Sequence, residues 1–188
     1  MASTSAQTIT SKKKKFTYDD YMKTPDDIRY ELIGGELLMT PAPVPRHQKI
    51  SREIEYELMK FAKEKKTGEV FYAPCDVYLD EENVVQPDLF FISKERTGII
   101  GEKNIQGAPD LVIEIISESN AYRDLVQKKR LYAKCGIKEY WIVIPEEETI
   151  EVYIIKDSAY TLHKTFNKAD ILESPYLTDF KLKLTSVF

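Results

Sequence analysis

Hydrophobic and polar residues alternate along this chain with two different periods. Between residues 46 and 64 the apolar side chains of Ile50, Ile54, Leu58 and Phe61 recur every three or four positions, with charged residues between them. This spacing is typical of an amphipathic helix that packs one face on a sheet. The pattern therefore predicts one long helix over this segment.

Two further helices are indicated by capping residues. The stretch FTYDDYMKTP, residues 16–25, predicts a short helix with Thr17 as its N-cap and Pro25 beyond its end. A turn over residues 117–120 leads to a predicted helix over residues 122–134, which ends at Gly136 because glycine readily adopts the conformation that closes a helix.

The other apolar runs have the composition and length of strands. They are RYELIGGELLMT (29–40, a hairpin that turns at Gly34 and Gly35), EVFYAPCDVYL (69–79), VVQPDLFFI (84–92), APDLVIEIIS (108–117), EYWIVIP (139–145), TIEVYII (149–155) and YTLHKTF (160–166). Residues 93–107 form a polar excursion. Because strands and helices interleave, the sequence predicts an α/β (α+β) fold with a central mixed sheet flanked by helices.

Length and charge limit the organisation and the partners. A chain of 188 residues fits a single domain, expected over residues 16–188 after a disordered polar tail at residues 1–15. No run is long enough to span a membrane and no apolar signal is present, so we expect a cytoplasmic protein without a membrane partner. With 27 basic and 31 acidic residues, the protein has no global attraction for polyanions, and a nucleic acid must bind a local patch.

Two acids interrupt predicted strands. Asp88 follows a proline within VVQPDLFFI, and Glu114 has only apolar neighbours within LVIEIIS. An unpaired buried carboxylate costs several kcal/mol or loses its charge, so a cation or strong donors should lie beside each acid. On neighbouring strands, the two acids would suit Mg²⁺, which binds one or two carboxylates, water and a substrate phosphate. The alternative is that each acid accepts backbone hydrogen bonds at a strand end, without a cation.

Lys128 supports the first interpretation. From Glu114 the strand advances about 10 Å to the expected turn, and the following helix returns about 10 Å between Ala121 and Lys128. Lys128 should therefore lie level with Glu114. Asp, Glu and Lys together form a set suited to phosphodiester cleavage, in which the acids hold the metal and the lysine orients water or stabilises negative charge. On its own, KKR on a helix is more often a solvated face.

Several segments, in order, resemble one known family. RYELIGGELL, PAPVPRHQKIS, VVQPDLFFI, GAPDLVIEIIS and DLVQKKRLYAKCGIKEYWIVIP follow the pattern of the Uma-type restriction endonuclease family, a branch of the PD-(D/E)XK nuclease superfamily. The resemblance covers residues 28 to about 188. It implies a restriction-endonuclease-like core and a Mg²⁺-dependent DNA endonuclease, with Mn²⁺ as a substitute ion.

The resemblance also implies residue roles. Asp88 and Glu114 would be metal ligands and Lys128 the catalytic lysine, although the superfamily usually places this lysine two residues after the second acid, where this chain has Ile116. Lys129 is a competitor for the role. Glu31 matches a position for a further metal-shell acid or a structural hydrogen bond. His47 matches a position that orients water or phosphate, or else caps the helix.

Alternative functions remain open at this point. The same fold can serve as a catalytically inactive module for DNA binding or protein assembly, and a third interpretation is a metal-dependent hydrolase of a smaller phosphoester. A nuclease requires a cation between Asp88 and Glu114, a module requires a basic face without one, and a small-substrate enzyme requires a closed pocket. For the endonuclease we expect a homodimer, because two-fold symmetry suits double-strand cutting.

Overall fold

The computed structural model of the protein describes residues 15–25, 27–117 and 123–188. Most of the expected tail at residues 1–15, and most of the expected turn at residues 117–120, lie outside this part of the chain. No helix within the described part is long and apolar enough to cross a membrane.

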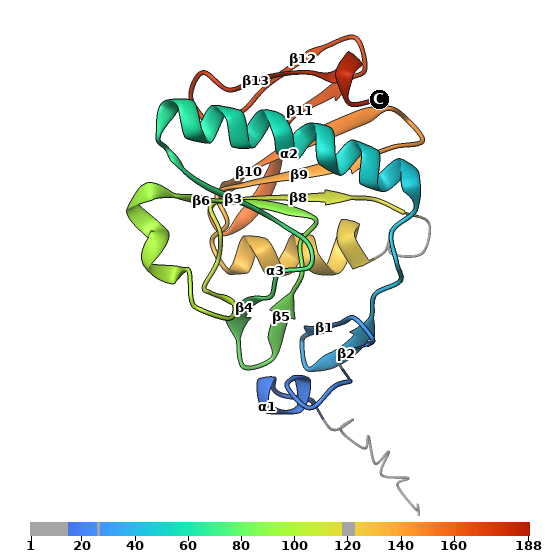
Figure 1. Cartoon of the computed structure of the whole chain (residues 1–188), viewed down its shortest axis with the longest axis vertical. Coiled ribbons are helices and arrows are strands. Elements are labelled where there is room, and N and C mark those ends of the chain that lie inside the picture. The colour runs from blue at the N-terminus through green and yellow to red at the C-terminus, as the bar shows by residue number, and fades with distance from the viewer. Residues whose placement is uncertain (1–14, 26, 118–122) are drawn as a thin grey trace, which may run out of the picture.

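A six-stranded mixed sheet forms the centre of the fold (Figure 1). Its order is β11 (Ala159–Asn167), β10 (Thr149–Lys156), β9 (Glu139–Ile144), β8 (Leu111–Ile115), β6 (Leu89–Ser93) and β3 (Gly68–Tyr72). Strands β8 and β9 run parallel, and every other neighbouring pair is antiparallel. The predicted mixed sheet is thus confirmed.

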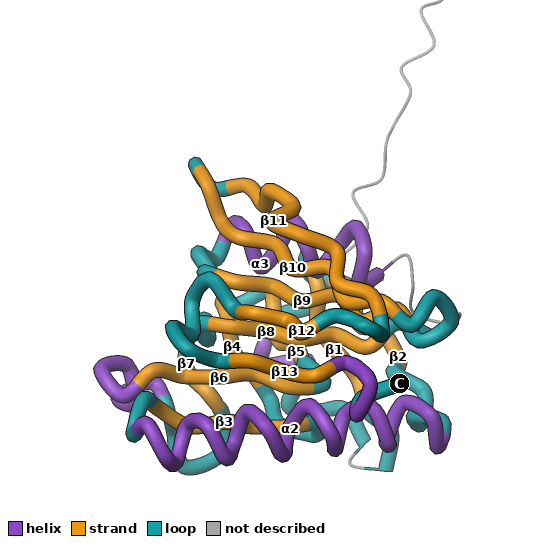
Figure 2. Tube along the Cα trace, turned by 90° about the horizontal axis from the view of Figure 1, so that it is seen from above, coloured by secondary structure: helices purple, strands orange, loops and turns teal. Residues whose placement is uncertain are grey.

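Two smaller sheets complete the β-structure. The five-stranded sheet has the order β2 (Glu36–Met39), β1 (Tyr30–Ile33), β5 (Asn83–Val85), β4 (Val77–Asp80) and β7 (Ile105–Gln106). The third sheet pairs β12 (Ile171–Glu173) with β13 (Lys181–Lys183), near the C-terminus. Figures 1 and 2 show β12 and β13 on the same side of the central sheet as the long helix.

The helices lie on both faces of the central sheet. They are α1 (Tyr18–Tyr21), α2 (Pro45–Lys65) and α3 (Lys129–Lys134), with a π-helical segment η2 (Arg123–Lys128) directly before α3 and 3₁₀ segments at η1 (Lys94–Ile99) and η3 (Leu184–Ser186). Figure 1 shows α2 over one face and α3 under the other. The sequence correctly predicted α2, the start of α1 after Thr17, and the β1–β2 hairpin, whose Gly34 and Gly35 have φ values of 60° and 81°.

Side chains of the central strands alternate between two hydrophobic clusters. Leu111, Ile113 and Ile115 of β8 pack with α2, whereas Val112 packs with α3. Successive side chains of a strand point to opposite faces. Glu114 is therefore on the α3 face, a placement that a continuous apolar run cannot reveal by itself.

Two predicted strands are each broken in the middle. The stretch 69–79 is divided between β3 and β4, and the stretch 84–92 between β5 and β6, so each crosses from one sheet to another. Pro74 and Pro87 lie in the two breaks. Proline cannot donate a ladder hydrogen bond, which favours a change of sheet at these positions. Asp88 consequently stands at a crossing, directly before β6.

The helix predicted over residues 122–134 is not uniformly α-helical. Residues 123–128 form the wider π-helical segment, and the α-helix begins only at Lys129. The predicted helix is therefore present over residues 123–134, but its first part is π-helical. A π-helical turn changes which residues share a helix face, and such turns occur frequently at functional sites. Here the change falls at Lys128.

Asp110, directly before the first residue of β8, forms ion pairs and a hydrogen bond with neighbouring segments. Its fully buried carboxylate contacts Arg96 at 3.0 Å and Lys138 at 2.8 Å, and accepts a hydrogen bond from the Ser93 amide at 2.9 Å. Burial acts to raise the pKa of the Asp110 carboxyl, but the hydrogen bonds from Lys138, Ser93 and Arg96 outweigh it and lower the pKa to about 2.

Asp110 should make the protein sensitive to acid. Because its pKa is lower in the folded state, its contribution of about 2 kcal/mol is present above pH ~4 and is lost as the pH falls towards 2. We expect Asp110→Asn to lower the free energy of unfolding near neutral pH and to flatten its decline below pH ~4, as measured by urea denaturation. Glu173→Gln, which breaks the exposed pair with Lys181, is the control and should change neither value appreciably. An unchanged acid limb in Asp110→Asn would contradict this assignment.

Candidate active site

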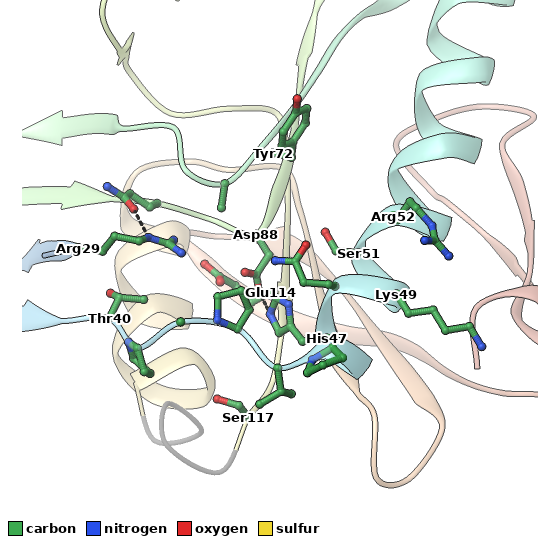
Figure 3. A pocket seen from close by; sticks show the side chains of 18 of the residues that line it. Arg29, Thr40, His47, Lys49, Ser51, Arg52, Tyr72, Asp88, Glu114 and Ser117 are labelled. Atoms are coloured by element: carbon green, nitrogen blue, oxygen red, sulfur yellow. Dashed lines mark hydrogen bonds and ion pairs between the residues drawn. The ribbon is translucent and has the colours of Figure 1, made fainter. Parts of the chain in front are cut away.

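A cavity of about 900 Å³ opens at one end of the central sheet. It is bordered by the β1–β2 hairpin, the loop that follows it, the first turns of α2 and the ends of β3 and β8 (Figure 3). Its acidic, basic and histidine lining residues are Arg29, Glu31, His47, Lys49, Arg52, Glu55, Asp88, Glu114 and Lys128. All five candidate residues favoured by the sequence, Glu31, His47, Asp88, Glu114 and Lys128, thus line one cavity.

Asp88 is held by two contacts to the same oxygen. Its Oδ2 accepts a hydrogen bond from the Ile115 amide at 2.8 Å and lies 3.0 Å from His47 Nε2. The side chains of His47 and Asp88 are 11% and 17% exposed, respectively. The contact with Ile115 fixes the Asp88 carboxylate against β8, and the contact with His47 links it to α2.

Asp88 and Glu114 face each other across neighbouring strands. Leu89 of β6 pairs with Ile113 of antiparallel β8, so the next opposed residues in this register are Asp88 and Glu114. Opposed residues of antiparallel strands point to the same face, with Cβ atoms about 5 Å apart. Asp88, directly before β6, and Glu114 of β8 thus lie at the same end of the central sheet, and their sharing of one ion stays a prediction.

Lys128 bridges two buried carboxylates. Its Nζ lies 3.0 Å from Glu114 Oε1 and 2.9 Å from Glu31 Oε1, while Lys128, Glu114 and Glu31 are only 3%, 2% and 1% exposed. Glu31 Oε1 also accepts a hydrogen bond from the Gln86 amide at 2.9 Å. The structural hydrogen bond considered for Glu31 is therefore present, and a role in the metal shell stays a prediction.

Tyr132 orients Glu114 from the following helical turn. Its hydroxyl donates a 2.6 Å hydrogen bond to Glu114 Oε1, the oxygen that also contacts Lys128. Burial, together with the nearby Glu114 and Glu31 carboxylates, raises the pKa of Tyr132 well above its ordinary value. The hydroxyl therefore stays protonated and remains a donor.

Lys129 occupies a different environment. Its Nζ lies 3.3 Å from the ring centroid of Tyr153, a cation–π contact, and burial lowers its pKa while Glu151 acts in the opposite direction. Lys129 does not line the cavity. Of the two lysines that the sequence left in competition, the structure brings Lys128 to Glu114 and Glu31.

The site's chemistry suits a divalent cation. The carboxyl groups of Glu31, Asp88 and Glu114 line one cavity, and buried charges need compensation. Carboxylate oxygens are ligands that Mg²⁺ prefers, and it requires only one or two of them. The described residues contain no preformed group of three or more His, Cys, Asp or Glu side chains arranged around a metal. Asp88 and Glu114 therefore fit an ion that retains water ligands.

Sequence reasoning missed several residues of the site. Tyr132 is fully buried and does not line the cavity, but its position four residues after Lys128 was a signal for a shared target on one helix face. Arg29, Lys49 and Arg52 line the cavity from segments far apart in sequence. No local motif marks them, because only the tertiary structure brings the hairpin beside α2.

The mixed sheet, its flanking helices and the acidic site at one sheet end define a restriction-endonuclease-like protein. The chain belongs to the family described as "Uma2: Putative restriction endonuclease", which matches residues 17–185. It is similar to the crystal structure of a putative nuclease belonging to DUF820 from Anabaena variabilis, with a TM-score of 0.77 and 20% sequence identity over 92% of this chain and 97% of that chain. No curated protein matches the chain. The predicted family and fold class are confirmed.

Removing Lys128 should destabilise the protein strongly. Lys128→Met leaves the buried Glu31 and Glu114 carboxylates without their shared cation, which typically costs about 3–5 kcal/mol. Lys129→Met is the matched control, and loss of its cation–π contact should cost about 1 kcal/mol. Urea denaturation of both variants at neutral pH measures the difference. Equal decreases in the free energy of unfolding of the two variants would show that the contacts of Lys128 with Glu31 and Glu114 do not stabilise the protein more than the contact of Lys129 with Tyr153 does.

Proposed function

We propose that the protein is a Mg²⁺-dependent DNA endonuclease that hydrolyses phosphodiester bonds at the Asp88–Glu114 site. The observation that carries this proposal is that Asp88, directly before β6, and Glu114 of β8 line one cavity together with a buried lysine. Membership in a family described as putative restriction endonucleases supports the same chemistry.

Asp88 and Glu114 would hold the ion through their carboxylate oxygens, with Mn²⁺ as a substitute. When bound, Mg²⁺ supplies a Lewis acid that lowers the pKa of a water ligand and polarises a phosphoryl oxygen. Tyr132 and Lys128 keep the Glu114 carboxylate oriented through its Oε1 atom. The Lys128 ammonium also lines the cavity, where it would stabilise negative charge that develops on the phosphate.

His47 would act as a positioning residue for Asp88. Its Nε2 lies 3.0 Å from Asp88 Oδ2, so the ring limits the rotation of the carboxylate that faces Glu114. Groups that bind a metal are commonly oriented by such outer contacts. Glu31, which contacts Lys128, would maintain the lysine in place and serves as a candidate for the outer metal shell.

A non-catalytic role is the main alternative. Lys128 already compensates part of the charge of Glu31 and Glu114, which favours a nuclease fold retained for DNA binding or protein assembly.

A homodimer is expected for a double-strand nuclease, since two copies related by a two-fold axis present two sites to the two strands. Cleavage assays and sedimentation separate these possibilities.

Substitution of either acid should abolish cleavage. Asp88→Asn and Glu114→Gln keep the side-chain shape but remove the charge that would hold the ion, so nicking of plasmid DNA with Mg²⁺ or Mn²⁺ should fall by at least about 100-fold. Lys128→Ala should lose activity as well, whereas Lys129→Ala should retain it. Circular dichroism and thermal melts of each variant establish whether the fold is intact.

The controls divide the outcomes clearly. Wild-type protein that cuts no nucleic acid with either ion would favour the binding module. Loss of fold in Asp88→Asn and Glu114→Gln would assign the acids a structural role. Full activity in Lys128→Ala would remove this lysine from the mechanism.

Metal binding should be visible without turnover. The acids repel one another when no cation lies between them, so a bound Mg²⁺ ion should stabilise the folded protein. At 100 times the Kd of Mg²⁺ the free energy of unfolding should increase by about 2.7 kcal/mol, and the melting temperature should rise with it. The shift should disappear on adding EDTA and should be absent in Asp88→Asn. An equal Mg²⁺ shift in wild type and Asp88→Asn would place the binding elsewhere.

A further inference from the structure

We infer that the substrate is a continuous DNA strand whose phosphates are held on both sides of the scissile bond, by Arg29 on one side and by Lys49 and Arg52 on the other. This inference rests on the proposed function and deepens it. It names the extent of the substrate: an internal segment of a strand rather than a small phosphoester or a strand end.

The three basic residues flank the acids from opposite walls of the cavity. Arg29 directly precedes β1, whereas Lys49 and Arg52 belong to the first two turns of α2. Figure 3 shows Arg29 on one side of Asp88 and Glu114, with Lys49 and Arg52 on the other. A strand that places one phosphate at the acids would therefore extend towards a cation in both directions.

The side chains on α2 are available to a ligand. Lys49 and Arg52 are three residues apart and so are neighbours on the helix surface. Lys49 is exposed, and the Arg52 side chain is 69% exposed, with an ion pair to the adjacent Glu53 at 3.0 Å. Exposed ion pairs of this kind contribute little, so a phosphate can replace the carboxylate at small cost.

Arg29 is positioned in advance. Its Nε donates a hydrogen bond to Gln86 Oε1 at 3.2 Å, and Gln86 in turn donates to Asp76 Oδ1 at 2.8 Å. A guanidinium carries five N–H donors and can bind a phosphate oxygen pair while one donor is in use. The contact to Gln86 thus fixes the direction of Arg29 along the cavity wall.

Charge explains why these local cations are required. The whole chain has a formal net charge of −4, and the cavity also contains the carboxyl groups of Glu31, Asp88 and Glu114. A polyanionic strand is therefore repelled by much of the molecule and needs compensation close to the site. The partial positive charge at the N-terminus of α2, which borders the cavity, acts in the same direction as Lys49 and Arg52.

Binding of a short DNA duplex in EDTA tests the inference without cleavage. Arg29→Gln and the double variant Lys49→Gln/Arg52→Gln should each weaken binding about tenfold or more, the equivalent of one or two charge-assisted hydrogen bonds. The slope of log Kd against log salt should fall by about one per lost phosphate contact. Lys134→Gln/Lys156→Gln removes two exposed cations outside the cavity and is the matched control. It should change neither quantity appreciably.

The outcomes separate this inference from the proposed function. If only Arg29→Gln or only the Lys49→Gln/Arg52→Gln variant weakens DNA binding, the strand ends at the site and the inference is overturned. If neither variant weakens DNA binding, or if the control weakens it equally, the inference is also overturned, while cleavage by the wild-type protein still supports the proposed function. Wild-type protein that binds DNA through both sides but never cuts it would overturn the endonuclease and leave the two-sided path intact. If wild type neither binds nor cuts DNA, both fail.

Discussion

The bridge from Lys128 to Glu31 and Glu114 is the interaction on which the site depends. Glu31 belongs to β1 of the five-stranded sheet, Glu114 to β8 of the central sheet, and Lys128 to the junction between η2 and α3. A single buried ammonium thus joins three parts of the fold. Removing one partner of such a cluster leaves an uncompensated buried charge, so all three positions are constrained together.

The passage of the chain from one sheet to the other at Pro87 determines the position of Asp88 in the site. The chain leaves β5, passes through Gln86 and Pro87, and enters β6 with Asp88 opposite Glu114. In the same segment the Gln86 amide donates to Glu31, and the Asp88 carboxylate accepts from Ile115. Backbone groups freed from regular pairing at the change of sheet are thereby used to hold the acids in place.

The arrangement gives the cavity two distinct regions. Its buried wall contains the paired charges that fix geometry, and its rim carries the half-buried Arg29 and the exposed Lys49 and Arg52. Buried charges are expensive to disturb, whereas exposed ones can exchange partners readily. Chemistry at the wall and attraction of a polyanion at the rim are therefore compatible in one site.

The sequence by itself determined the long amphipathic helix, the glycine hairpin and the mixed sheet, and it marked Asp88 and Glu114 as acids within apolar runs, because periodicity and turn chemistry are local properties. It did not determine that two predicted strands divide at Pro74 and Pro87, since each half is equally apolar and only its partner strands assign it to a sheet. The preference for Lys128 over Lys129 likewise depended on the π-helical segment before α3. The grouping of basic residues at the cavity rim depended on the packing of the β1–β2 hairpin beside α2. These features depend on contacts between distant segments, which no local pattern encodes.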